Sequence, residues 1–171
     1  QGSWAATYQG RVWVGNDATV YFTAPGSFND FSTSSGGGNF TSADSFLQNA
    51  WVRGISTNGF LYLIGDSSIN YISGVQTSGT PPITTFTNQN ADPEIGTPYP
   101  AAVITVGQNI LLANSLGVYV LAGAKVSKVS EVLDGVWNSV ANFGALQLSA
   151  VGCGVGCCPC VGFVQDRAGQ R

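Results

Sequence analysis

One pattern recurs three times at a fixed interval, and this repeat limits the folds open to the chain more than any other feature. Each copy is an apolar run, a small polar turn and a second apolar run. The copies cover residues 12–22, 61–71 and 110–120. The equivalent residues Val20, Ile69 and Val118 are separated by 49 residues in both intervals. Because two apolar runs around a tight turn are typical of a β-hairpin, each copy predicts one buried hairpin. These hairpins are expected near residues 11–24, 60–73 and 109–122.

The length of the repeat indicates the architecture. A period of about 50 residues with about four strands in each unit is that of a β-propeller blade. Residues upstream keep the spacing, since Gly10 aligns with Gly59, and Ala6 aligns with Ile55 and Ile104. One small sheet cannot cover its own two apolar faces, so neighbouring sheets must stack on it. We therefore expect an all-β fold of antiparallel blade repeats of about 49 residues, resembling part of a β-propeller.

The blades are expected to pack on one another and to need a partner. The strand positions predicted to form equivalent contacts between blades are Val12, Val20, Leu61, Ile69, Leu111 and Val118. At this period, 171 residues supply about three and a half blades, whereas about four to eight close a ring. We expect residues 1–150 to form the blade-repeat domain and residues 151–171 a separate tail. The chain is expected to associate with copies of itself or with other chains, or to be part of a longer polypeptide.

Composition excludes several classes of protein. Only 9% of the residues are charged while 44% are hydrophobic, and the chain carries six Lys and Arg residues with a net charge of −3. A protein that grips a phosphate backbone needs a basic surface, so nucleic-acid binding is disfavoured. No apolar stretch reaches the about 20 residues that a membrane span requires. The low charge instead favours a surface that is largely covered by a partner.

The segments between the apolar runs have the composition of turns and crossovers. Residues 32–39 (STSSGGGN) are predicted to form a flexible Gly/Ser loop. Residues 90–100 contain three prolines, which exclude a central strand and favour a crossover. Residues 125–130 (KVSKVS) alternate in polarity, as an edge strand does.

The segments that carry a resemblance are Gly10–Val14, Val20–Gly26, Asn29–Phe31, Gly59–Ile69, Val103–Val106, Ile110–Leu112, Leu116–Gly123, Lys128–Ser130 and Asp134-Gly135. Together they resemble the blade pattern of tail proteins from short-tailed bacteriophages, the tail nozzle or packaged-DNA stabilisation proteins. The match covers about residues 4–140. The resemblance implies a structural virion protein that forms a ring at the tail channel, with other tail proteins or further copies as partners. It implies no catalytic residue and no cofactor.

The last 21 residues, from Val151 to Arg171, depart from this pattern and contain every cysteine of the chain. These are Cys153, Cys157, Cys158 and Cys160. Four thiolates can hold zinc, but the spacing lacks the C-x₂-C pairs of zinc knuckles, and adjacent cysteines point in opposite directions in an extended chain. Two disulfides are the alternative in an oxidising compartment. A Gly/Cys-rich tail foreign to the blades, with no metal, is the interpretation that we favour.

Catalysis is not predicted. The chain has no histidine, which excludes Ser-His-Asp and Cys-His relays and histidine-ligated metals. The acids, which form no recognisable arrangement, are Asp17, Asp66, Asp92, Glu94, Glu131 and Asp134. Asp17 and Asp66 occupy equivalent turns, where an aspartate usually hydrogen-bonds its own backbone. Asp92 and Glu94 could ligate calcium with nearby carbonyls, although a solvated loop is the simpler interpretation.

Tryptophans supply the second functional hypothesis. Trp4, Trp51 and Trp137 lie at the edges of the repeats, where indole rings could stack on sugars or contact a partner. A carbohydrate-binding, lectin-like propeller with an extracellular location is therefore the alternative to the virion protein. The third copy weakens this series, because Leu111 stands where the first copy has Trp13.

Overall fold

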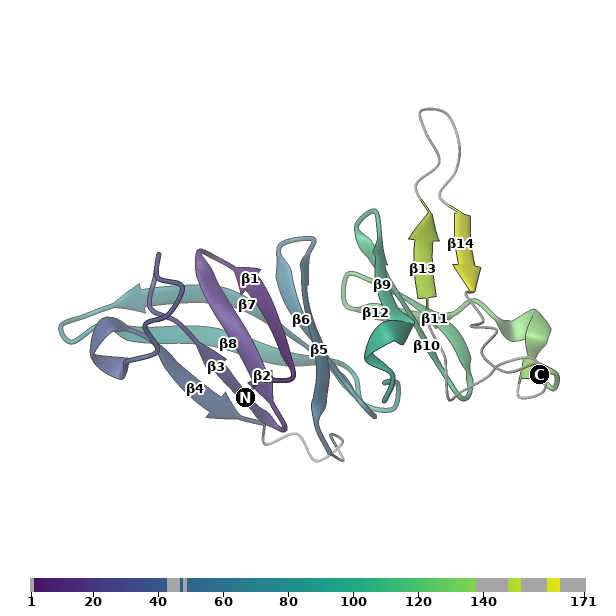
Figure 1. Cartoon of the computed structure of the whole chain (residues 1–171), viewed down its shortest axis with the longest axis horizontal. Coiled ribbons are helices and arrows are strands. Elements are labelled where there is room, and N and C mark those ends of the chain that lie inside the picture. The colour runs from purple at the N-terminus through teal and green to yellow at the C-terminus, as the bar shows by residue number, and fades with distance from the viewer. Residues whose placement is uncertain (1, 43–46, 48, 138–147, 152–159, 164–171) are drawn as a thin grey trace, which may run out of the picture. The chain divides into compact units, whose positions relative to one another are not determined.

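The computed structural model describes residues 2–42, 47 and 49–137, together with the backbone of residues 148–151 and 160–163. The chain divides into two compact units, residues 1–98 and 99–171. The separate tail from residue 151 stays a prediction. The described residues form β-strands and short 3₁₀ turns, and the strands build three four-stranded antiparallel sheets (Figure 1). The prediction of an all-β fold with antiparallel repeats is confirmed.

Each copy of the repeat is one sheet whose strands follow chain order. Sheet A contains β1 (Trp4–Tyr8), β2 (Arg11–Asn16), β3 (Thr19–Phe22) and β4 (Gly38–Thr41). Sheet B contains β5 (Trp51–Thr57), β6 (Phe60–Gly65), β7 (Ile69–Ser78) and β8 (Ile83–Asp92). Sheet C contains β9 (Val103–Val106), β10 (Asn109–Asn114), β11 (Gly117–Ala122) and β12 (Lys125–Lys128). All three predicted hairpins are present, as β2–β3, β6–β7 and β10–β11.

The pairing register follows the 49-residue period. The equivalent pairs of the first two strands are Ala6–Trp13, Ile55–Tyr62 and Ile104–Leu111. The equivalent pairs of the central hairpins are Val14–Tyr21, Leu63–Asn70 and Leu112–Tyr119. A shift of one residue would turn every side chain to the opposite face, so this agreement means that equivalent residues share a face in all three sheets.

Sheets A and B share one hydrophobic core, which we call the aromatic core. Its buried members are Trp4, Tyr8, Trp13, Val20, Phe22, Trp51, Leu61, Leu63 and Ile72. Leu61 occupies the repeat position of Val12, whereas the equivalent of Trp13 is Tyr62. Because successive side chains alternate between faces, the Trp13 face of sheet A packs on the opposite face of sheet B. The two sheets therefore stack front to back.

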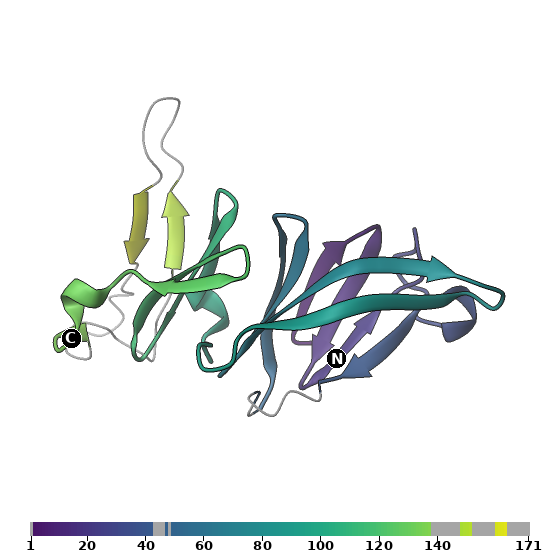
Figure 2. The same cartoon turned by 180° about the vertical axis from the view of Figure 1, so that it is seen from behind.

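The hairpin β7–β8 extends this packing over sheet A. Both of its strands have ten residues, compared with four in β3 and in β4. Figure 2 shows the hairpin in front of the strands of sheet A. Phe86 from β8 makes edge contacts with the rings of Trp13 and Phe22, with centroids 5.7 Å apart in both pairs. The hairpin thus covers one side of the aromatic core.

Sheet C packs on a smaller cluster. Ala102, Ala113, Val118 and Trp137 are its buried members, and Leu111 is half-buried against them. In the same unit, β13 (Leu148–Val151) pairs with β14 (Cys160–Phe163).

The six positions predicted to form equivalent contacts do not behave alike. Val20, Leu61, Ile69 and Val118 are buried, whereas Val12 and Leu111 are half-buried. Val20 and Leu61 belong to the aromatic core, and Val118 belongs to the small cluster of sheet C. Equivalence of contacts was therefore wrong for Val12 and Leu111. Leu111 is the repeat equivalent of Trp13 and Tyr62, and the third-copy equivalent of Val12 and Leu61 is Ile110, which is buried. Val12 is only half-buried because its repeat position is covered differently in each copy.

Two predictions about connecting segments were also wrong in part. Thr33–Ser35 form a 3₁₀ turn, Gly36–Gly38 are buried, and β4 begins at Gly38, so residues 32–39 are ordered structure and not a flexible loop. The strand β8 continues to Asp92, into the segment predicted as a crossover. Within the part of the chain that the structure describes, no helix is long and apolar enough to cross a membrane.

Candidate functional site

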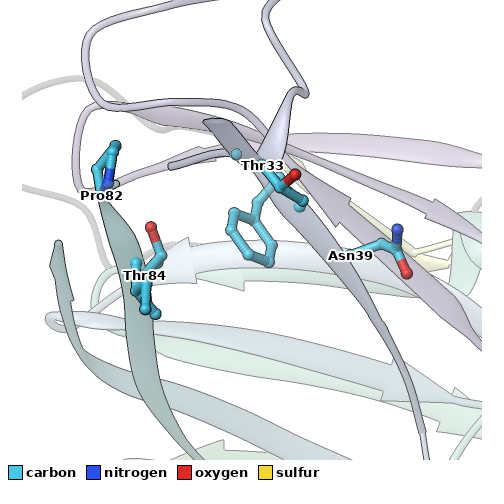
Figure 3. A pocket seen from close by; sticks show the side chains of 8 residues that line it. Thr33, Asn39, Pro82 and Thr84 are labelled. Carbon is cyan, nitrogen blue, oxygen red and sulfur yellow. The ribbon is translucent and has the colours of Figure 1, made fainter. Parts of the chain in front are cut away.

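A cavity of about 270 Å³ opens in the first unit, between the segment before β4 and the tip of the hairpin β7–β8 (Figure 3). The residues that line it are Phe22, Thr33, Gly37, Gly38, Asn39, Pro82, Ile83 and Thr84. Figure 3 shows Pro82 and Thr84 on one side and Thr33 and Asn39 on the other. We call this hollow the hairpin cavity. It is a candidate binding site in the described part of the chain.

Glycines shape one wall of the hairpin cavity. A Cβ atom on Gly38 would lie 3.1 Å from Cζ of Phe22, and one on Gly37 would lie 2.7 Å from the backbone of Phe31. Gly36 ends the 3₁₀ turn with a φ of 85°, a conformation that glycine adopts at little cost. The run Gly36–Gly38 therefore lets the chain turn and lie against the Phe22 ring.

A buried arginine joins this wall to the hairpin. Nη1 of Arg11 donates hydrogen bonds to the carbonyl oxygens of Thr23 and Gly36, at 2.5 and 2.9 Å. Nη2 donates to Oγ1 of Thr84 at 3.0 Å and to Oγ1 of Thr77. Only 4% of Arg11 is exposed. We call this set of bonds the arginine clamp.

The clamp holds its charge without a carboxylate. Within the described residues, the ion pair found is Lys128–Asp134, which does not involve Arg11. The Arg11 guanidinium is therefore stabilised by neutral oxygens. Its Cζ atom lies 5.8 Å from the centroid of the Phe22 ring. Burial lowers the pKa of Arg11. An arginine has five N–H donors, and protein oxygens occupy four of them here. The arginine clamp therefore fixes the hairpin and leaves little capacity for a bound anion.

The chemistry of the hairpin cavity is that of binding. Phe22, Pro82 and Ile83 supply apolar surface, and Ile83 is 63% exposed. Asn39 offers amide donors and an acceptor, and Thr33 offers a hydroxyl. The Thr84 hydroxyl already donates to the Gly36 carbonyl at 2.6 Å. The described residues that line the cavity carry no titratable side chain, so they offer neither a general acid nor a general base.

The three predicted tryptophans lie in the interior. Trp4 is 9% exposed, Trp51 is fully buried and Trp137 is 6% exposed. Nε1 of Trp4 donates to the Trp51 carbonyl, and Nε1 of Trp137 donates to the Asn114 carbonyl, both at 2.9 Å. The structure therefore gives these rings a packing role, and a contact of theirs with a glycan or a partner stays a prediction.

Trp4 shows how closely the two sheets of the first unit approach. A Cβ atom on Gly15 or on Gly54 would lie 2.1 Å from ring atoms of Trp4. The indole thus fills the space over two glycines, one in β2 and one in β5. The position of Trp4 at the edge of the first repeat predicted that its ring is exposed. The ring is buried because the second repeat covers this edge of the first.

The turn acids bind their own backbone or neighbouring amides. Oδ1 of Asp92 accepts hydrogen bonds from the backbone N–H groups of Glu94 and Ile95, at 2.9 and 3.0 Å. Oδ2 of Asp66 accepts one from Nδ2 of Asn49 at 2.5 Å. In the described ranges, no three His, Cys, Asp or Glu residues gather as metal ligands. Calcium binding at Asp92 and Glu94 stays a hypothesis, and the described residues place no third acidic side chain beside them.

The cysteine tail gives no further site. Cys153, Cys157 and Cys158 lie outside the described residues, and Cys160 is the first residue of β14. Zinc, disulfides and a tail without metal all stay predictions.

Sequence reasoning missed both the hairpin cavity and the arginine clamp. The only signal for the clamp was an arginine between Gly10 and Val12 in a chain with few charges, at a position where the second copy has Phe60. Comparisons with family models and with curated proteins gave no match to this chain.

Proposed function

We propose that this protein is a structural component of a bacteriophage tail, in which each four-stranded sheet is a blade of a β-propeller-like ring. The front-to-back stacking of sheets A and B carries the proposal, because consecutive blades of a propeller cover each other in this way. The common register of the three sheets adds support, since a ring needs equivalent units. No catalytic role is proposed.

Exposed apolar side chains support an assembled state. Phe28 is 80% exposed and Val132 is 94% exposed, and further exposed apolar residues flank Val132. The sequence neighbours of Val132 that are exposed are Val129, Leu133 and Val136, and Leu116 is exposed as well. Large apolar groups gathered at a surface mark a site of contact with another molecule. Three four-stranded sheets are also fewer than the about four to eight that close a ring, so further blades must come from outside the described residues.

The proposal assigns the protein to the virion and gives it copies of itself or other tail proteins as partners. Electron microscopy of the purified chain should show rings or larger assemblies, and sedimentation velocity should show species heavier than the 17.7 kDa monomer. An antibody against the chain should label the tail of phage particles purified from its source. A stable monomer at every concentration, together with unlabelled tails, would contradict the proposal.

Carbohydrate binding is the second candidate, and the hairpin cavity is the observation that favours it. Sugar sites combine apolar surface with amide and hydroxyl groups, and the cavity offers the exposed Ile83 together with Asn39 and Thr33. Under this alternative the protein is extracellular. A glycan array probed with the intact chain and with Asn39→Ala separates the two functions. Binding by the intact chain that the variant loses would favour the lectin-like role.

A further inference from the structure

The last strands of the three sheets, β4, β8 and β12, differ in the features that prevent an open edge from pairing with another chain. β4 has four residues, and β12 has four with Lys125 and Lys128 at its ends. β8 has ten residues and carries one charge, Asp92, at its last position. Natural proteins protect open edges with short strands and lysines, because unpaired N–H and C=O groups otherwise pair with another chain. Among β4, β8 and β12, the last strands of the three sheets, β8 lacks both protections.

The open edge of β8 is also accessible. Among the described strands, β8 pairs with β7 alone. Asn88, Gln89 and Asn90 are all exposed, and Thr85 and Thr87 are exposed as well. Since successive side chains point to opposite faces, three consecutive exposed residues mean that neither face is covered there. Pro82 and Pro93 flank the strand and lie outside the stretch from Thr85 to Gln89.

We propose that β8 is an assembly edge that pairs antiparallel with β8 of a second copy of this chain. A two-fold axis brings identical surfaces together, and an antiparallel edge is complementary to itself under such an axis. The stretch from Thr84 to Ala91 carries no charge, so two copies would meet without like-charge repulsion. The inference deepens the proposed function by naming a partner, and it rests on that function only in expecting copies to associate.

The test compares two variants with the same added charge, one with lysines in the edge strand β8 and one with lysines in the neighbouring strand β7. Thr85→Lys/Asn88→Lys gives β8 the lysine spacing of β12, while Gln76→Lys/Ser78→Lys adds the same charge to exposed positions of β7. We expect the edge variant to weaken self-association in sedimentation velocity by at least about tenfold, and the β7 variant to leave it nearly unchanged. Circular dichroism melts confirm that both variants fold, and Asn88→Lys alone serves if the double variant does not.

Amide hydrogen exchange locates the contact. In the unmodified chain, amides of β8 should become more protected as concentration rises, and this gain should vanish in the edge variant. β8 amides that stay equally exchangeable at all concentrations would overturn the inference, and so would an equal loss of association in both variants. Rings seen by microscopy without β8 protection would reject the edge contact alone and leave the proposed function standing. Monomers that lack rings and β8 protection would reject both.

Discussion

The two units build the same sheet from the same repeat but complete their cores differently. In residues 1–98, two copies cover each other, and three tryptophans lie in the shared core. In residues 99–171, the third copy is closed by two alanines, a valine and Trp137, which comes from beyond the repeat's strands. The repeat therefore determines strand order and register, while side-chain size at each position determines how much apolar surface is covered.

One repeat position makes the difference plain. Trp13, Tyr62 and Leu111 are equivalent, and each is paired with the equivalent residue of the preceding strand. Trp13 is fully buried and Tyr62 is 1% exposed, whereas Leu111 is half-buried. Burial raises the pKa of the Tyr62 phenol. Identical backbone pairing thus holds three side chains of different size in three different environments.

The largest expected effect comes from removing a tryptophan from each core. Trp13→Ala should lower the free energy of unfolding by about 3–5 kcal/mol, because a fully buried indole leaves a large cavity. Trp137→Ala should cost less, since its cluster consists of small side chains with fewer atoms to lose contact with. Urea denaturation followed by circular dichroism measures both. Equal costs would mean that the two cores are alike in strength.

A leucine pair tests the same difference without aromatic residues. Leu61→Ala should cost about 2–5 kcal/mol, because Leu61 is fully buried in the aromatic core. Leu111→Ala should cost less than about 2 kcal/mol, since Leu111 keeps part of its surface in water. Thermal and urea unfolding of the two variants give the comparison. A larger loss at Leu111 would show that its surroundings are more tightly packed than its burial indicates.

Strand order and hairpin positions could be predicted because local rules determine them. Alternating apolar runs and small turn residues define a hairpin, and the 49-residue interval fixed its place in each copy. The burial of Trp4 could not be predicted in this way, since it depends on Gly15 and Gly54 from two different sheets. The arginine clamp likewise joins Arg11 to Thr77 and Thr84, contacts that no local pattern contains.

Breaking the arginine clamp should affect the first unit alone. Arg11→Met keeps much of the side-chain volume but removes the four hydrogen bonds of the clamp, which leaves the Thr23 and Gly36 carbonyls without this partner. Hydrogen bonds from a charged donor contribute about 1.5–3 kcal/mol each, so a loss of at least that size is expected. Lys125→Met, at an exposed position of β12, is the control and should change stability by less than about 0.5 kcal/mol.

Hydrogen exchange shows where the clamp acts. Amides of β7 and β8 should exchange faster in Arg11→Met, because the hairpin tip loses its attachment to the wall of the hairpin cavity. Amides of sheet C should be unaffected. Faster exchange in both units would contradict a local role for the clamp.

The smallest effects are expected at turns, where both units place a glycine with positive φ. Gly10 and Gly59 follow Gln9 and Asn58, which also have positive φ, whereas Gly107 comes first in its turn. β1–β2, β5–β6 and β9–β10 are joined by two-residue turns that contain Gly10, Gly59 and Gly107, with φ of 66°, 78° and 62°. A Cβ atom at any of these glycines would meet nothing within 4 Å, so replacement by alanine adds backbone strain without a clash.

Left-handed backbone costs an alanine about 1–2 kcal/mol, and each of the three Gly→Ala variants should lose about that much, whatever core lies beneath its turn. Urea denaturation of the three single variants is the measurement. Agreement among them, although Gly107 occupies a different turn position, would show that the cost of a side chain at a positive-φ residue is local, so that the differences seen at Trp13 and Trp137 come from packing. A much larger loss at Gly59 than at Gly107 would instead mean that the turns of the first unit are coupled to its core.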